Sequence, residues 1–258
     1  MGLLRGRRGP RTEPRRPLRR SQGLKAALPG TAYREAGERY LELFKELGGL
    51  QPAHAVLEPG CGTGRMAIPL TTYLTTEGSY DGFDVMAEAV EECVNEIGSS
   101  HPNFHFQHVD VHNQVYNPGG SLDPDSFAFP YPDESFDFVF LTSVFTHMLP
   151  PEVRHYMEEV RRVLKPIGRS LMTFFLLNPG ATAAINAGKT KRTFAHVGEG
   201  FRFDIPGRPE AAVAYREDDA LSLIEAAGLA VDGVHHGRWT GREPAAAGQD
   251  VIVVKHPG

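Results

Sequence analysis

The sequence predicts an α/β protein with a doubly wound, Rossmann-like fold, in which a mostly parallel seven-stranded sheet ends in an antiparallel C-terminal hairpin. From about residue 33 onwards, short apolar runs alternate with longer amphipathic segments. This alternation is typical of parallel strands joined by right-handed helical crossovers. Only the segment TGREPAAAGQ separates the last two apolar runs. That is short for a helical crossover and indicates an antiparallel pair.

Each element has a local signature. The first helix, YREAGERYLELFKEL, has apolar side chains at helical spacing and stops at Gly48-Gly49. The expected strands are HAVLEPG, GSYDGFDV, NFHFQHVDV, SFDFVFLTSVF, RSLMTFFLL, AVDGVHHGRW and DVIVVKH. The expected helices between them are GRMAIPLTTYL, MAEAVEECVNEI, PPEVRHYMEEVRRVLKP and REDDALSLIEAAGL. Pro69 should lie in the early turns of its helix or kink it, and the helix from Pro150 should close before Pro166.

The charge is unevenly distributed along the chain. Residues 1–25 have a net charge of +8, whereas the whole chain has −5, so the remaining residues sum to −13. We expect residues 1–28 to form an Arg-rich disordered tail, and residues 29–258 to form one domain with loop insertions at about 112–135 and 178–213. The alternative for the tail is contact with nucleic acid or an anionic surface. The acidic body gives no support for a nucleic-acid substrate.

The composition is that of a soluble globular protein, with 41% hydrophobic and 23% charged residues. The longest apolar runs are far shorter than the ~18 residues that span a bilayer, so no membrane span is expected. Two cysteines, Cys61 and Cys93, cannot form a disulfide framework, and a cytoplasmic location is expected. The sequence carries no signal for an oligomeric state.

The segment VLEPGCGTG suggests a nucleoside site. Gly60, Gly62 and Gly64 fall between a strand and a helix, where backbone N–H groups and the helix dipole can meet a ligand. Asp84 ends the second strand, at a spacing suited to holding ribose hydroxyls. The loop lacks the G-x-G-x-x-G spacing of dinucleotide sites. Glu58 just before it is poorly suited to a pyrophosphate and better suited to a ligand with an ammonium group.

The ordered series of motifs resembles the class I S-adenosylmethionine (SAM)-dependent methyltransferases over roughly residues 33–256. The matching segments are VLEPGCGTG, GFDV, HVDV, FPYPDESFDFVFLTSVFTHM and EEVRRVLKPIGRSLMTFF. Two positions depart from the common pattern. Ile167 takes a glycine position in the KPIG turn, and Pro59 precedes the first glycine, as in part of the family.

The resemblance implies a set of SAM contacts at the strand ends. These are Glu58, Gly60, Cys61, Gly62, Gly64, Asp84, Val85, Met86, Asp110, Val111, Leu141 and Thr142. By this resemblance Glu58 and the glycine-loop backbone would hold the methionine end, together with the backbone at the end of the fourth strand. Asp84 would accept from the ribose hydroxyls and Asp110 from the adenine amino group, with Val85 or Met86 against the adenine. The alternative for both aspartates is an ordinary role in strand-end turns.

His147 is the candidate general base. It follows the fourth strand at the expected pocket edge, and its ordinary pKa suits proton removal near neutrality. Methyl transfer needs a base only when the acceptor must lose a proton, as a hydroxyl must. The alternative is a structural histidine. No metal is expected, since no cysteine or ordered acid completes a site around the histidines at 101–112. Cys61 has no evident base partner and is a poor nucleophile candidate.

These observations predict an enzyme that transfers a methyl group from SAM to a small-molecule acceptor, most simply a hydroxyl. Aromatic residues in the two insertions could line an apolar acceptor pocket, or could instead fasten the loops to the body. Three alternatives remain open. They are an RNA or protein methyltransferase that captures its substrate with the tail, a nicotinamide-dependent dehydrogenase, and a non-catalytic SAM-binding module.

Overall fold

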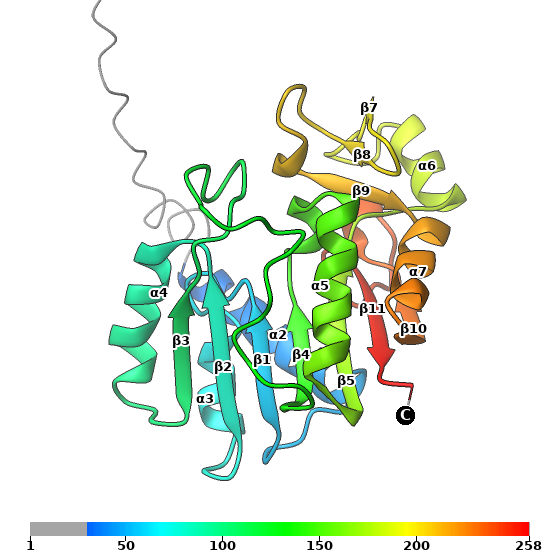
Figure 1. The fold of residues 1–258 in the computed structure, drawn as a ribbon. Coiled ribbons are helices and arrows are strands. Elements are labelled where there is room, and N and C mark those ends of the chain that lie inside the picture. The colour runs from blue at the N-terminus through cyan, green and yellow to red at the C-terminus, as the bar shows by residue number, and fades with distance from the viewer. Residues whose placement is uncertain (1–29, 258) are drawn as a thin grey trace, which may run out of the picture.

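The computed structural model describes residues 30–257, and Figure 1 shows their arrangement. The prediction of a disordered tail at residues 1–28 lies outside the described residues. The main body is a seven-stranded sheet with the strand order β10-β11-β5-β4-β1-β2-β3. Its strands are β1 (Ala55–Pro59), β2 (Ser79–Asp84), β3 (Phe104–His108), β4 (Phe136–Leu141), β5 (Leu164–Phe174), β10 (Ala230–His235) and β11 (Asp250–Lys255).

Strand direction confirms the predicted topology. Strands β1 to β5 pair in parallel, whereas β11 pairs antiparallel with both β5 and β10. The reversal of strand order between β1 and β4 creates the switch point at which such sheets bind ligands. The carboxyl ends of β1, β2 and β4 therefore meet beside one another at one edge of the sheet.

Helices cover both faces of the sheet (Figure 1). They are α2 (Gly30–Glu46), α3 (Ala67–Tyr73), α4 (Ala87–Cys93), α5 (Pro150–Val163), α6 (Pro179–Asn186) and α7 (Glu217–Ala226). Alternate side chains of each strand enter two separate cores, as the period of a strand requires. Val56 packs with the cluster under α2 and α3, and the adjacent Leu57 packs with the cluster under α5 and α7. Pro69 lies in the first turn of α3, as expected.

Two details differ from the sequence-based expectation. The segment 178–213 is not a plain loop, because it contains α6, β7 (His196–Val197), β8 (Arg202–Phe203) and a 3-10 turn. With β6 (Leu176–Leu177) and β9 (Val213–Arg216), these strands form a second sheet in the order β6-β9-β8-β7. Strand β5 also begins earlier than expected. It includes the KPIG segment, which bulges because Phe136 pairs with Leu164 and Phe138 pairs with Arg169.

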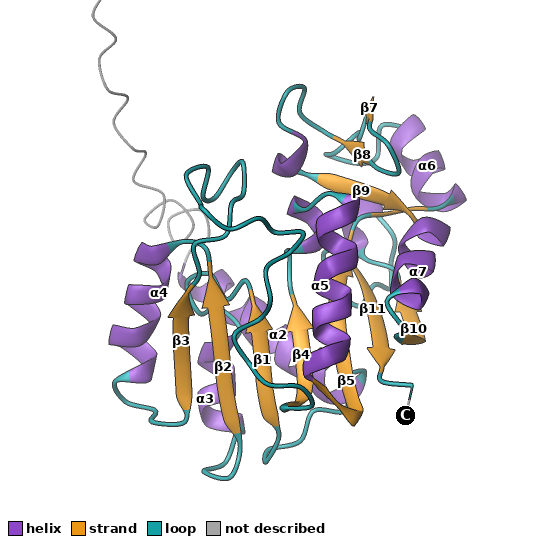
Figure 2. Ribbon diagram, in the orientation of Figure 1, coloured by secondary structure: helices purple, strands orange, loops and turns teal. Residues whose placement is uncertain are grey.

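The connection between β3 and β4, residues 109–135, is mostly irregular (Figure 2). It begins at the carboxyl end of β3 and returns along α5 to the start of β4. Both insertions start from the carboxyl ends of strands, at the edge of the sheet where a ligand is expected.

Within residues 30–257, no helix combines the length and apolar character needed to cross a bilayer.

Candidate active site

A cavity of about 270 Å³ lies at the carboxyl ends of β1, β2 and β4. Most of the residues that the sequence singled out line it. These are Glu58, Gly60, Cys61, Gly62, Asp84, Val85, Met86, Val111, Thr142 and His147. Tyr33 of α2 closes one side, where its hydroxyl donates to the carbonyl of Thr63 at 3.0 Å. The fold thus brings residues from five separate segments of the chain to one cavity.

The glycine loop exposes its backbone to this cavity. Gly60, Gly62 and Gly64 all have positive φ, a conformation that favours glycine. A Cβ on Gly60 would lie 2.6 Å from Val144, whereas a Cβ on Gly62 would meet no atom within 4 Å. Gly62 therefore borders open space. A ligand can approach the main chain there.

Asp84 is held in place by the glycine loop. One carboxylate oxygen accepts from the Gly62 N–H at 2.7 Å, and the other accepts from the Met86 N–H at 2.8 Å. Burial raises the pKa of Asp84, and these two N–H groups oppose that rise. Each oxygen has a further lone pair for a hydroxyl donor. The carboxylate is thus preoriented at the strand end, beside the loop.

Glu58 is a buried carboxyl at the end of β1. Its Oε2 lies 2.5 Å from the hydroxyl of Tyr80, which donates to it. Burial raises the pKa of Glu58 well above its ordinary value, and the bond from Tyr80 only partly opposes this. A cationic group placed against Glu58 would favour the ionised form. The site therefore suits an ammonium group better than an anion.

Three predicted residues do not line the cavity. A Cβ on Gly64 would lie 2.8 Å from Ile97, so this glycine faces the helical layer. Leu141 is fully buried in the core. The exposed carboxylate of Asp110 accepts from the hydroxyl of Ser121 at 2.7 Å and from the side chain of Asn117 at 3.1 Å. In this structure Asp110 ties the start of the insertion, and its contact with an adenine stays a prediction.

His147 lies at the cavity in a 3-10 turn after β4. Its Nδ1 is 2.8 Å from the carbonyl oxygen of Glu210. Because a carbonyl only accepts, Nδ1 carries the hydrogen, and the lone pair of the neutral ring is on Nε2. Burial lowers the pKa of His147, the bond to Glu210 opposes this, and Arg192 adds to the lowering. The ring is therefore neutral near pH 7, with Nε2 able to accept a proton.

Both insertions hold His147. The hydroxyl of Tyr116 lies 3.3 Å from Nε2, and the side chain of Asn113 donates to the backbone carbonyl of His147 at 3.0 Å. The carboxylate of Glu210 in turn accepts from the N–H of Gln114 at 2.7 Å. The segments around residues 113 and 210 thus meet at this histidine. Its position depends on both.

Sequence reasoning missed Glu152, which lines the same cavity together with Tyr156 and Met148. Glu152 accepts from the N–H of Leu149 at 2.7 Å and so caps the start of α5. Burial raises the pKa of Glu152 to about 7, the Leu149 N–H opposes the rise, and the carboxylates of Glu210 and Asp125 add to it. A glutamate in the first turn of a helix indicates a capping box. The sequence around Glu152 does not, however, indicate that its side chain faces a cavity.

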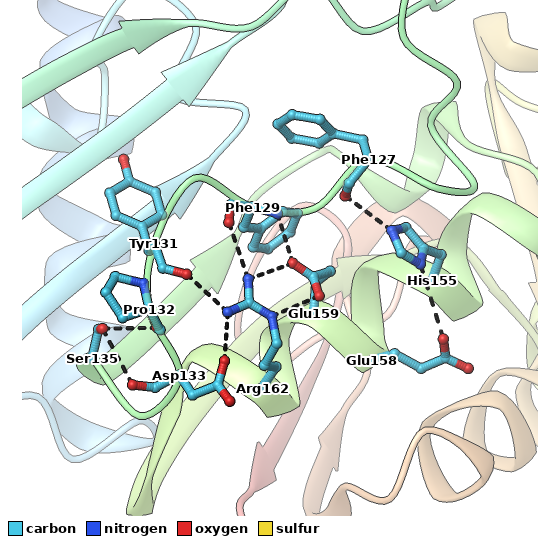
Figure 3. A network of polar contacts seen from close by, with 10 residues as sticks. All are labelled: Phe127, Phe129, Tyr131, Pro132, Asp133, Ser135, His155, Glu158, Glu159 and Arg162. Atoms are coloured by element: carbon cyan, nitrogen blue, oxygen red, sulfur yellow. Dashed lines mark hydrogen bonds and ion pairs between the residues drawn. The ribbon is translucent and has the colours of Figure 1, made fainter.

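A polar network fastens the second half of the 109–135 connection to α5 (Figure 3). The guanidinium of Arg162 donates to Glu159, to Asp133 and to the backbone carbonyls of Phe129 and Tyr131, at 2.6–3.0 Å. Glu159 also accepts from the N–H of Phe129 at 2.6 Å. Burial alone would raise the pKa of Glu159, but these bonds hold it below its ordinary value. This clamp fixes residues 129–133 against α5, whose residues Glu152 and Tyr156 line the cavity.

Replacing Arg162 by Ala is expected to lower the free energy of unfolding by about 2 kcal/mol, because Glu159 would remain buried without its cation. Urea denaturation measures the loss, and limited proteolysis should then cut within residues 109–135. Arg154→Ala on the same helix is the matched control. Its partner Glu158 is 3.9 Å away and both side chains are exposed, so we expect a change within about 0.5 kcal/mol. Equal losses in the two variants would contradict the clamp.

Comparisons with known proteins agree with this geometry. Residues 56–168 match the family model described as a methyltransferase domain. The chain is 31% identical over 145 residues to the 27-O-demethylrifamycin SV methyltransferase of Amycolatopsis mediterranei (strain S699), covering 55% of this chain and 47% of that protein. It is 28% identical over 140 residues to the tRNA N(3)-cytidine methyltransferase METTL2 of Gallus gallus, covering 53% of this chain and 34% of that one. The chain thus spans less than half of either relative.

The fold is also found among solved structures. A SAM-dependent methyltransferase from Aquifex aeolicus superposes with a TM-score of 0.57 at 18% identity, covering 91% of this chain and 96% of that one. At 18% identity, this similarity shows that the two chains share a fold.

Within residues 30–257, no group of three or more His, Cys, Asp or Glu side chains could hold a metal ion.

Proposed function

We infer that this chain, which belongs to the class I SAM-dependent methyltransferases, binds SAM in the cavity at the ends of β1, β2 and β4. We further propose that it transfers the methyl group to a hydroxyl of a small molecule, with His147 as the general base. The observation that carries this proposal is one cavity that holds an exposed glycine loop, a preoriented Asp84 and a neutral, oriented histidine.

The described residues fit the cofactor. Gly62 leaves its backbone open to the cavity, Asp84 has lone pairs for two hydroxyls, and Glu58 suits the ammonium group. When bound, SAM would supply an electrophilic methyl group on a sulfonium. Tyr33 and the glycine loop would limit water around the reacting groups, and such exclusion strengthens electrostatic interactions in the site.

His147 would take the proton that the acceptor hydroxyl loses. Nε2 accepts it, while the Nδ1–H continues to donate to the Glu210 carbonyl, which stabilises the cationic ring. The lowered pKa of His147, caused mainly by burial, keeps the base form populated at neutral pH. The proton would leave to solvent as the ring returns to its neutral state.

The surroundings of His147 favour a small acceptor over RNA. The cavity wall near it carries Met148, Tyr156, Tyr116 and the carboxylate of Glu152. A largely apolar wall with a few polar groups is typical of sites for small organic molecules, and an acidic side chain offers no favourable contact to a phosphate backbone. The relative named for 27-O-demethylrifamycin SV points the same way, whereas the relative named for tRNA keeps the RNA alternative as an outcome of the test.

The test is incubation of the full chain with methyl-labelled SAM and a cell extract. A labelled small molecule that resists alkaline hydrolysis of esters and carries a new methyl ether would support the proposal. Label in RNA or protein instead would favour the alternative substrates. Binding of SAM by calorimetry with no labelled product would indicate a non-catalytic binding module, and failure to bind SAM would contradict the cofactor.

The cofactor site should release a proton when it is filled. Burial raises the pKa of Glu58 and so favours its protonated form in the free protein, whereas an ammonium group favours the ionised carboxylate. Affinity for S-adenosylhomocysteine, the demethylated product, should therefore fall as pH decreases, by up to about tenfold per pH unit. Calorimetric titrations in buffers of different ionisation enthalpy measure how many protons the protein releases when S-adenosylhomocysteine binds. The Glu58→Gln variant should release none, and a wild type that also releases none would contradict this role.

A further inference from the structure

A second cavity, of about 250 Å³, lies between α2 and the segment that connects β10 to β11. Three arginines from three different elements line it. Arg39 comes from α2, Arg65 follows the glycine loop, and Arg238 belongs to the 3-10 turn after β10. We call this cavity the arginine groove. The remaining lining residues are Ala36, Tyr40, Leu43, Ser143, Ala246, Ala247, Gly248 and Gln249, so no carboxylate lines it.

The positive charge of the groove is poorly compensated. Arg39 lies 3.9 Å from Glu35, but both side chains are more than half exposed, and such pairs contribute little. Among residues 30–257, neither Arg65 nor Arg238 forms an ion pair with a carboxylate within 4.0 Å. A bound anion would pair with guanidinium groups that lack a close carboxylate partner.

Neutral donors complete the groove. Tyr40 lines the groove together with Arg39 and Arg65; burial raises the pKa of Tyr40, and the two arginines oppose that rise. The hydroxyl of Ser143 donates to Oε1 of Gln249 at 3.0 Å, which leaves the NH₂ group of Gln249 available as a donor. The groove is therefore rich in hydrogen-bond donors. Guanidinium groups match phosphate oxygens in particular, since they donate in pairs.

The arginine groove adjoins the candidate active site. Arg65 and Ser143 line both cavities. The active site carries three acidic side chains, Glu58, Asp84 and Glu152, with Arg65 at its border, whereas no acidic side chain lines the groove. A ligand in the groove would thus contact two residues at the border of the active site. Binding in one cavity is expected to alter affinity in the other, reciprocally.

We propose that the arginine groove is a binding site for the phosphate group of a small, freely diffusing phosphorylated compound, separate from the cofactor cavity. Pyrophosphate is the probe. Binding is measured by calorimetry on the full chain, and the arginine variants described below separate binding in the groove from binding to the Arg-rich N-terminal residues. Titration of the full chain at constant ionic strength should give a saturable signal, and sodium acetate should give none.

Arg238→Gln and Arg39→Gln should each weaken pyrophosphate binding about tenfold or more, because each removes a charge-assisted pair of donors. Neither residue lines the cofactor cavity, so affinity for S-adenosylhomocysteine in the absence of pyrophosphate should stay unchanged. Arg216→Gln is the matched control, since Arg216 is exposed and lies 3.9 Å from Asp218 on another face. It should leave pyrophosphate binding as in the wild type.

Three outcomes would overturn the proposal. They are no binding of pyrophosphate, binding that Arg238→Gln and Arg39→Gln leave unchanged, and binding to phosphatidic acid vesicles without binding to pyrophosphate. The proposal does not depend on the proposed function. If S-adenosylhomocysteine fails to bind while pyrophosphate binds and the two variants lose it, the methyltransferase function is contradicted and the anion site stands.

Discussion

Replacing Gly62 by Asp is expected to weaken binding of SAM and of S-adenosylhomocysteine by about 100-fold or more, which corresponds to at least ~2.7 kcal/mol of binding free energy. The Cβ of a new side chain would enter open space at this position, because no atom lies within 4 Å of it. That space is the cavity itself. The added carboxylate would occupy it and lie near Asp84, whose oxygen is 2.7 Å from the Gly62 nitrogen. Like charges in a shielded site repel strongly.

The matched control is Gly188→Asp. Gly188 also has a positive φ, of 64° against 53° at Gly62, and a Cβ there also meets no atom within 4 Å. It follows α6, away from the cavity lining. Both variants should therefore show a similar backbone penalty in thermal unfolding, of about 1 kcal/mol, while only Gly62→Asp loses cofactor binding in calorimetry. Retained affinity in Gly62→Asp would contradict the assignment of the glycine loop.

The sheet could be predicted because its determinants are local. Each long strand has a continuous apolar run, and the alternation with amphipathic helices fixes parallel pairing and handedness. The second sheet could not be predicted. Its strands β7 and β8 are two residues long, too short to show any period, and their pairing depends on tertiary contacts. The early start of β5 was missed for a related reason, since a Pro-containing turn motif and a bulged strand look alike in sequence.

The site could be predicted only in part. The topology of a parallel sheet brings the ends of β1, β2 and β4 together, so the glycine loop, Asp84 and His147 follow from strand order. The partners of His147 do not follow from it. Glu210 is 63 residues away along the chain and Tyr116 is 31, and both belong to insertions with no fixed geometry in the fold. The arginine groove escaped notice because its three arginines come from distant segments.

Replacing His147 by Ala is expected to reduce kcat by ~10²–10⁴ once an acceptor has been identified, because the hydroxyl loses its proton acceptor. Affinity for S-adenosylhomocysteine should stay within about twofold, since the contacts at Gly62 and Asp84 come from β1 and β2. Because burial lowers the pKa of His147 and the neutral form is the base, the wild-type rate should begin to fall at a lower pH than it would with an unperturbed histidine. The decrease follows protonation of the ring. His147→Ala should lack this acid limb.

A structural role for His147 makes a different prediction, and His147→Asn separates the two. Asparagine can still donate to the Glu210 carbonyl, as Nδ1 does at 2.8 Å, but it cannot take up a proton. If His147 is the base, His147→Asn should lose as much activity as His147→Ala, and added imidazole should restore part of the rate in the alanine variant. Tyr116→Phe should cost only a few-fold, because the bond from Nδ1 to Glu210 still orients the ring. Activity near the wild-type level in His147→Asn would instead show that this histidine serves to join the two insertions.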